Sequence, residues 1–202
     1  MDQTSSHKMY GGRTVSAVAF LLAASLLHCA CIFLPASARA VAALKNRTAH
    51  PLPADFDSSA TLDTLLQPGN DTSRWSSTRA ATIEGYVVRV HRAGIEAANS
   101  FSLTRRDTHI EIASRRDAPP RERVIVEVTP PWRDWAKARG LDWSAEALQR
   151  TLVGRRCRFE GWLFFDRAHA DESENTNPGR PGNWRATAWE IHPVTTITVV
   201  DQ

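Results

Sequence analysis

The chain has 202 residues, of which 42% are hydrophobic and 23% are charged, so it can bury the core of one domain of ordinary size. This composition excludes a wholly disordered protein, and a single long apolar run excludes a polytopic membrane protein. Three of the 25 basic and one of the 22 acidic residues lie in the first 40, which leaves 22 bases and 21 acids in the rest. A nearly neutral body is a poor electrostatic trap for nucleic acid.

Residues 1–40 have the pattern of an export signal. Basic residues precede an apolar run over 15–34, and small residues follow it. This order predicts a secretory signal peptide cleaved after Ala38 or Ala40, and hence a periplasmic or secreted bacterial protein. The apolar run is also long enough to span a bilayer, so an anchor in the inner membrane is the alternative. In both cases, we expect the chain to contact a membrane only through this N-terminal segment.

Residues 41–79 are rich in proline, serine and aspartate, which predicts a flexible linker with one short helical turn near 62–66. The folded domain is expected over 80–202, a comfortable size for a single domain. Cys157 is the only cysteine outside the first 40 residues, so the cleaved chain would fold without an intramolecular disulfide. Because Cys157 alternates with apolar residues, we expect a buried thiol rather than a nucleophile.

Alternating apolar and polar residues predict three successive strands. In the first of them, Gly85 indicates a bulge or sharp bend, and the alternation places Val87 and Val90 on opposite faces. A loop rich in proline and charge separates the second strand from the third. The predicted strands cover residues 82–92, 108–114 and 123–129.

Helical structure is expected next, followed by a return to strands. Two adjacent prolines begin one short helix, and Ser144 is a suitable N-cap for a second that ends near Gly154. The long fourth strand contains Gly161, and a polar loop follows it. The expected ranges are helices at 132–139 and 145–153, a strand at 155–165, a loop at 166–183, and a last strand or pair of strands at 184–191 and 195–200.

Three strands, a helical connection and two more strands form the order of an oligonucleotide/oligosaccharide-binding (OB) barrel. The stretch Gly154 to Asp166 (GRRCRFEGWLFFD) resembles the fourth strand of OB-fold domains. The stretch Trp184 to Thr195 (WRATAWEIHPVT) looks like the ending of a group of exported bacterial OB-type proteins of unassigned function. The resemblance spans about residues 82–200 and implies a mainly β, five-stranded Greek-key barrel, with a small open sandwich as the competing architecture.

Candidate ligand-binding residues are the aromatic and charged side chains expected on outer strand faces and flanking loops, where OB barrels bind. Trp162 and Phe164 share a strand face, which is either an exposed stacking surface or is covered by another segment. The other candidates are Tyr86, Arg89, His109, Glu111, Trp184, Arg185 and His192.

Two pairs of histidine and glutamate suggest a second kind of site. His109 alternates with Glu111, and Glu190 alternates with His192, so convergence of these faces would suit a metal such as zinc. The chain lacks a glycine-rich phosphate loop, a Gly-x-Ser-x-Gly elbow and a paired-cysteine zinc pattern. A phosphodiesterase-like alternative would use His109 or His192 as a general base beside nearby arginines.

The sequence therefore predicts an exported, non-catalytic OB-type binding module with no cofactor. Its ligand is a nucleic acid, a glycan or another protein, and net charge does not support nucleic acid. The alternative is a metal-dependent hydrolase or phosphodiesterase on the same barrel, using His109 and His192.

Overall fold

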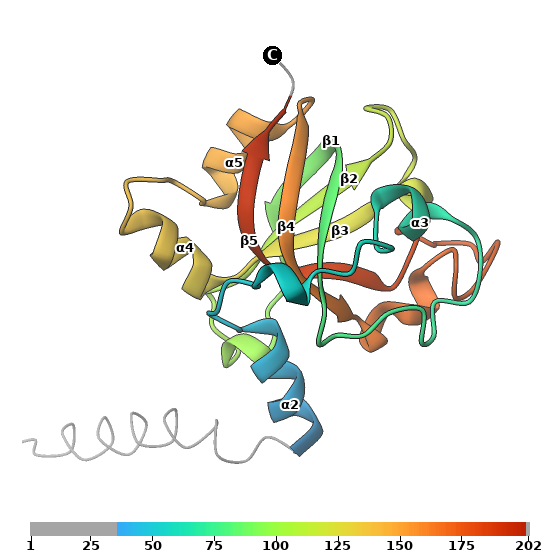
Figure 1. Ribbon diagram of the computed structural model, residues 1–202, viewed down its shortest axis with the longest axis horizontal. Helices are drawn as coiled ribbons and strands as arrows, with labels where there is room; N and C mark the ends of the chain where they lie inside the picture. The colour runs from blue at the N-terminus through green and yellow to red at the C-terminus, as the bar shows by residue number, and fades with distance from the viewer. Residues whose placement is uncertain (1–35, 201–202) are drawn as a thin grey trace, which may run out of the picture. The chain divides into compact units, whose positions relative to one another are not determined.

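Five strands form a closed barrel in the order β1-β2-β3-β5-β4, which confirms the expected mainly β, OB-type architecture over the open sandwich (Figure 1). The computed structural model describes residues 36–200. All neighbouring strands are antiparallel except β3 and β5, which are parallel. The strands are β1 (Ala80–Arg92), β2 (Thr108–Ala113), β3 (Val124–Val128), β4 (Arg156–Phe165) and β5 (Trp189–Val199).

The barrel interior is filled by the alternating apolar side chains of these strands. Val126, Phe159 and Leu163 belong to one buried cluster and have no exposed surface. Cys157 is in the same cluster, as its alternation predicted. Since β2 and β3 are buried along their whole lengths, the side chains on their outer faces have as little exposed surface as those on their inner faces.

Both strand glycines lie where another segment approaches closely. A Cβ on Gly161 would lie 2.2 Å from the carbonyl oxygen of Pro193, and the pairing of β4 with β5 shifts register there. In β1 the register shifts between Val87 and Arg89, two residues after Gly85. This bulge puts both Val87 and Val90 in the core, which corrects the expectation that they point to opposite faces.

Two short helices connect β3 to β4 along one side of the barrel (Figure 1). They are α4 (Pro130–Lys137) and α5 (Ala145–Leu152). The hydroxyl of Ser144 accepts a hydrogen bond from the backbone N–H of Ala147, so the predicted N-cap is confirmed. Trp132 and Leu148 fix the two helices by joining the barrel core.

Residues 46–79 pack against the barrel, which corrects the expectation of a flexible linker. They contain the 3-10 helix η2 (Pro53–Asp55) and the helix α3 (Leu62–Leu66), the latter at the predicted helical turn. Leu65 is fully buried, and Asp71 accepts a hydrogen bond from the backbone N–H of Ala188. Few apolar residues suffice here because Ala60, Leu62 and Leu65 join the barrel core and Asp71 bonds to the barrel backbone.

The helix α2 (Ala36–Lys45) precedes this segment. The predicted export segment covers residues 1–40, and all but its last five residues lie outside the described part of the chain. Among residues 36–200, no helix has the length and apolar character needed to cross a bilayer.

Two loops flank the outer face of the barrel near the start of β2. The loop between β1 and β2 contains the 3-10 helix η3 (Ala97–Asn99), and the loop between β4 and β5 contains η5 (Arg167–Glu172). One more 3-10 helix, η4 (Pro120–Glu122), precedes β3. The last strand is continuous through Pro193 and begins at Trp189, so Trp184 lies in the loop rather than in a strand.

Candidate functional site

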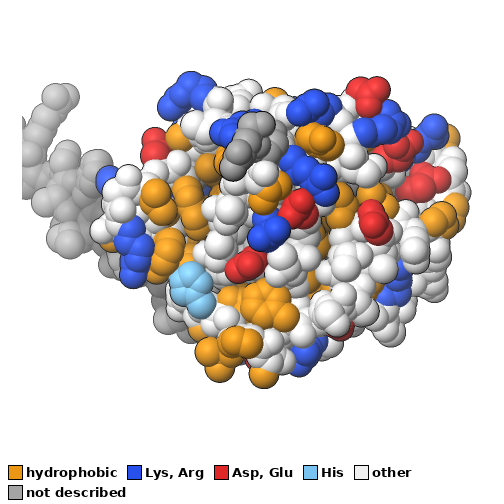
Figure 2. Space-filling model, turned by 45° about the horizontal axis from the view of Figure 1, so that its top comes forward, with side chains coloured by type: hydrophobic (Ala, Val, Ile, Leu, Met, Phe, Trp, Pro, Cys, Tyr) orange, Lys and Arg blue, Asp and Glu red, His pale blue; other side chains and the backbone are white. Residues whose placement is uncertain are grey.

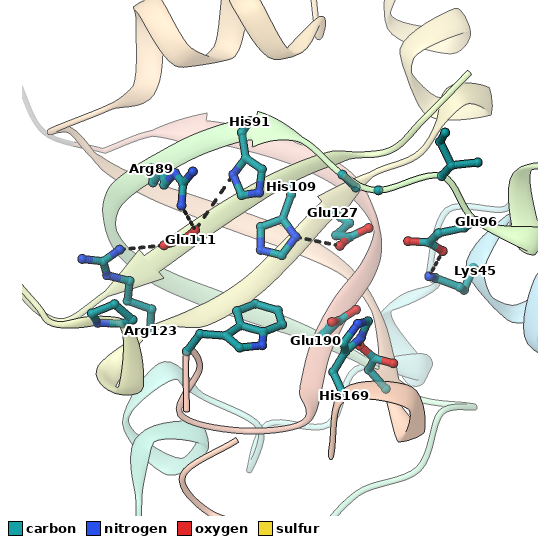
Figure 3. Close-up of a pocket in the computed structure, with 16 residues that line it drawn as sticks. Lys45, Arg89, His91, Glu96, His109, Glu111, Arg123, Glu127, His169 and Glu190 are labelled. Carbon is teal, nitrogen blue, oxygen red and sulfur yellow. Dashed lines mark hydrogen bonds and ion pairs between the residues drawn. The ribbon is translucent and has the colours of Figure 1, made fainter. Parts of the chain in front are cut away.

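A cleft of about 510 Å³ opens on the outer face of β1, β2 and β3 (Figure 3). Its floor carries polar side chains from these strands and from β5. Its walls come from the β1–β2 loop, including Ile95 and Glu96, and from the β4–β5 loop, including His169 and Trp184. These are the strand face and the two loops with which OB barrels bind oligonucleotides and oligosaccharides.

Strand register places His91, His109 and Glu127 side by side across the floor. His91 pairs with His109 across β1 and β2, and His109 pairs with Glu127 across β2 and β3. The two imidazole rings lie 4.5 Å apart at their centroids. Nδ1 of His109 lies 3.1 Å from Oε1 of Glu127. Because a carboxylate only accepts, this contact favours the imidazole form of His109 with a proton on Nδ1 and a lone pair on Nε2.

Glu111 lies beside this row and is held by two arginines (Figure 3). Its Oε2 accepts a hydrogen bond of 2.7 Å from Arg123, and its Oε1 lies 3.5 Å from Arg89 and 3.9 Å from Nδ1 of His91. Burial lowers the pKa of His91, and the neighbouring His109 and Arg89 lower it further, so this imidazole is neutral near pH 7.

His192 lies beneath the cleft floor, with no exposed surface. Its Nδ1 is 3.2 Å from Glu190 and 3.5 Å from Glu127, and its Nε2 is 3.4 Å from Asp107. Burial lowers its pKa, but the charge of Glu127 and the contacts with Asp107 and Glu190 outweigh burial and raise the pKa to about 10. His192 is therefore a buried cation that binds three carboxylates together.

Arg185 is a second buried cation, also without exposed surface. It donates to Asp166 at 2.9 Å and to Glu190. Burial raises the pKa of Glu190, but the charges of Arg185 and His192 outweigh burial and hold it well below the usual range. Arg185 therefore fastens the start of the β4–β5 loop to β5 and fixes one wall of the cleft.

Lys45 and Glu96 form an ion pair at the edge of the cleft, between α2 and the β1–β2 loop (Figure 3). Burial lowers the pKa of Lys45, but the carboxylates of Glu127, Glu190 and Glu96 outweigh it and raise the pKa above its usual range. On the opposite loop, a hydrogen bond that His169 donates to the carboxylate of Asp166 raises the pKa of His169. Lys45 thus links the β1–β2 loop to the carboxylates of the floor, and Asp166 holds His169 within the β4–β5 loop.

Four of the nine predicted ligand-binding residues meet in this cleft: Arg89, His109, Glu111 and Trp184. Arg185 and His192 support the cleft from beneath its surface instead, because their charges are matched by buried carboxylates. Tyr86 lies outside it, with the guanidinium of Arg116 stacked 4.5 Å from its ring.

Trp162 and Phe164 contact residues 45–49, at the end of α2 and just after it. The indole N–H of Trp162 donates to the carbonyl of Ala49, and the guanidinium of Arg47 lies 4.6 Å from the ring. Phe164 is 4% exposed and lies under Lys45. Phe164 is therefore covered, whereas Trp162 is partly buried and its ring is stacked with the guanidinium of Arg47.

Sequence reasoning missed His91 and Glu127, the two neighbours of His109. Cross-strand pairing of the predicted first and second strands could have suggested His91, but the bulge before Arg89 shifts that register. Glu127 stands in a strand of buried valines, so a polar residue at that position was the available signal.

Two sets of three side chains could hold a metal ion within residues 36–200. One nitrogen or carboxylate oxygen from each of His91, His109 and Glu111 lies within 4.8 Å of the others, and the same holds for Asp107, Glu127 and His192. The sequence left open whether His109 and His192 converge on a metal; in the structure they fall in different sets and share a neighbour, Glu127, which contacts both. No protein-family model matches the chain, and no curated protein is detectably similar to it.

Proposed function

We propose that this chain is an exported, non-catalytic OB-type binding module whose ligand occupies the cleft on the outer face of β1, β2 and β3. The observation that carries the proposal is the position of the cleft. It combines that strand face with both the β1–β2 and the β4–β5 loops, the arrangement with which OB barrels bind extended ligands.

The charge of the cleft argues against nucleic acid and for a glycan. Five carboxylates line it (Glu96, Glu111, Glu127, Asp166 and Glu190), together with three Lys or Arg side chains (Lys45, Arg89 and Arg123) and three histidines (His91, His109 and His169). Because the buried Arg185 and His192 also pair with carboxylates of the floor, the site has balanced charge and no surplus of positive charge to attract a phosphate backbone. On another face, Lys, Arg, Asp and Glu side chains are interspersed without a basic stripe (Figure 2).

The remaining chemistry of the cleft suits a neutral, hydroxyl-rich ligand. The partly buried indole of Trp184 stands in one loop, and Ile95, 49% exposed, stands in the other. Flat apolar surface packs against the C–H faces of a sugar ring, while carboxylates and guanidinium groups bond its hydroxyls. A short glycan therefore fits the cleft better than a polyanion does.

The test is a calorimetric and tryptophan-fluorescence titration of the full chain with short chito-, cello- and malto-oligosaccharides. We expect at least one of them to bind, and Trp184→Leu to weaken that binding by about tenfold or more. Trp162→Leu is the matched control and is expected to leave it unchanged. Binding of single-stranded DNA at low salt with no glycan binding would contradict the assignment.

A metal-dependent hydrolase or phosphodiesterase on the same barrel is the second candidate. The convergence of His91, His109 and Glu111 in the open cleft favours it. His192, the other histidine predicted for this role, is buried between carboxylates and does not line the cleft. Hydrolysis of bis(p-nitrophenyl) phosphate by the zinc-loaded chain, lost in Glu111→Gln, would establish this function in place of the first.

A further inference from the structure

Two imidazole nitrogens in the cleft are buried and have no hydrogen-bond partner. They are Nδ1 of His91 and Nε2 of His109. The side chain of His109 is 9% exposed, and the two rings lie 4.5 Å apart. A buried polar atom without a partner costs about 1–3 kcal/mol, so two of them beside each other call for a shared partner.

The contact between His109 and Glu127 decides what kind of partner that is. The carboxylate of Glu127 lies 3.1 Å from Nδ1, so the imidazole form that best fits this contact has its proton on Nδ1 and a lone pair on the unpartnered Nε2. Histidines that bind metals are typically oriented in this way, with the second ring nitrogen donating to a carboxylate.

Glu111 supplies a third potential ligand, a carboxylate whose negative charge would attract a metal cation. Its Oε2 is held at 2.7 Å by Arg123, while Oε1 faces His91 at 3.9 Å, too far for a hydrogen bond. Arg123 thus fixes one carboxylate oxygen, while the other lies 3.5 Å from Arg89 and faces His91. Arg89, the other cation nearby, has a side chain that is 62% exposed and can turn into solvent.

We infer that His91, His109 and Glu111 bind a divalent transition-metal ion, with zinc as the best match to their chemistry. Their ligand atoms lie within 4.8 Å of one another, and the ion would draw them closer. Two imidazoles and one carboxylate leave a fourth position, which faces the cleft. The inference goes beyond glycan binding, because the metal alone is the ligand.

The neighbouring set of Asp107, Glu127 and His192 does not compete for the ion. Both nitrogens of His192 face carboxylates at 3.2 to 3.5 Å, so each is best satisfied by donating a proton. All three side chains are at most 6% exposed, and neither Asp107 nor His192 lines the cleft. That set is a closed ion-pair network, whereas the first opens to solvent.

The test is a titration of the full chain with Co²⁺ after treatment with a chelator, followed by visible absorption. We expect one Co²⁺ per chain, displaced by one equivalent of Zn²⁺, with the intense absorption of a four-coordinate site. His91→Ala and Glu111→Gln are each expected to weaken binding by about tenfold or more. His91 is the better position to change because its side chain is 35% exposed, so its loss leaves the fold intact by circular dichroism.

Three comparisons make the assignment specific. His169→Ala, which removes an imidazole from the wall of the same cleft, should leave the Co²⁺ affinity unchanged. Arg89→Gln should tighten binding by about fivefold, since it removes a cation beside the carboxylate. Ca²⁺ and Mg²⁺ should compete poorly because they prefer oxygen ligands. Absence of stoichiometric Co²⁺ binding, or binding unaffected by His91→Ala, would overturn the inference, whether or not a glycan binds.

Discussion

Nδ1 of His109 lies 3.1 Å from Oε1 of Glu127, so a carboxylate on β3 sets the orientation of an imidazole on β2. The same carboxylate lies 3.5 Å from His192 on β5. Glu127 therefore couples the open floor of the cleft to the closed ion-pair network beneath it.

Glu127→Gln tests the first half of this coupling. The amide is a weaker acceptor than the carboxylate and can present its N–H₂ group to His109 instead, so the free lone pair on Nε2 is no longer fixed. We expect Co²⁺ affinity to fall by about 10- to 100-fold, although Glu127 does not itself bind the ion. Glu96→Gln, at the edge of the same cleft, is the control; an equal loss in both variants would show only a general effect of charge.

The pH dependence of unfolding tests the second half. The pKa of His192 is about 10 in the folded chain against an ordinary value of 6.5, so the folded state holds a proton that the unfolded state releases. Its contribution to stability is complete below pH 6.5 and is lost as pH rises toward and through 10. We expect the free energy of unfolding in urea to fall by about 1–3 kcal/mol more between pH 6.5 and 9 for the native chain than for His192→Gln. Parallel curves for the two chains would contradict this role.

Arg185→Met tests whether the cleft wall depends on a buried ion pair. Removing the guanidinium leaves the carboxylates of Asp166 and Glu190 without their common partner, which should cost about 3–5 kcal/mol of unfolding free energy. The matched change is Arg158→Met, whose side chain is 48% exposed and pairs with Glu84 at the surface. That variant should lose less than about 1 kcal/mol. Chemical denaturation of both proteins measures the difference, and similar losses would refute the distinction.

The alternation of apolar residues was sufficient to predict the five strands, because one closed core makes period-two patterning visible in each of them. Residues 46–79 could not be assigned to the core by composition, because Leu62 and Leu65 stand among many polar residues in the sequence although both pack in the hydrophobic core. Sequence reasoning located only part of the candidate site. Its members come from three strands whose register depends on the bulge in β1, and Arg185 carries a charge that distant Asp166 neutralises.

Leu65→Ala tests the contribution of the segment before the barrel. Leu65 is fully buried, so its truncation should cost about 2–5 kcal/mol of unfolding free energy. Leu52→Ala makes the same chemical change at a side chain that is 67% exposed, where the cost should be within about 0.5 kcal/mol. If the two variants unfolded at the same urea concentration, residues 46–79 would be a linker after all.

The most direct test of the cleft as the binding site is a ¹H–¹⁵N spectrum of the labelled chain titrated with the same oligosaccharides. We predict that the shifted signals belong to the β1–β2 loop, the outer residues of β2 and the indole N–H of Trp184. Shifts centred on Tyr86 or Trp162 instead, or no shifts with any oligosaccharide, would contradict the account.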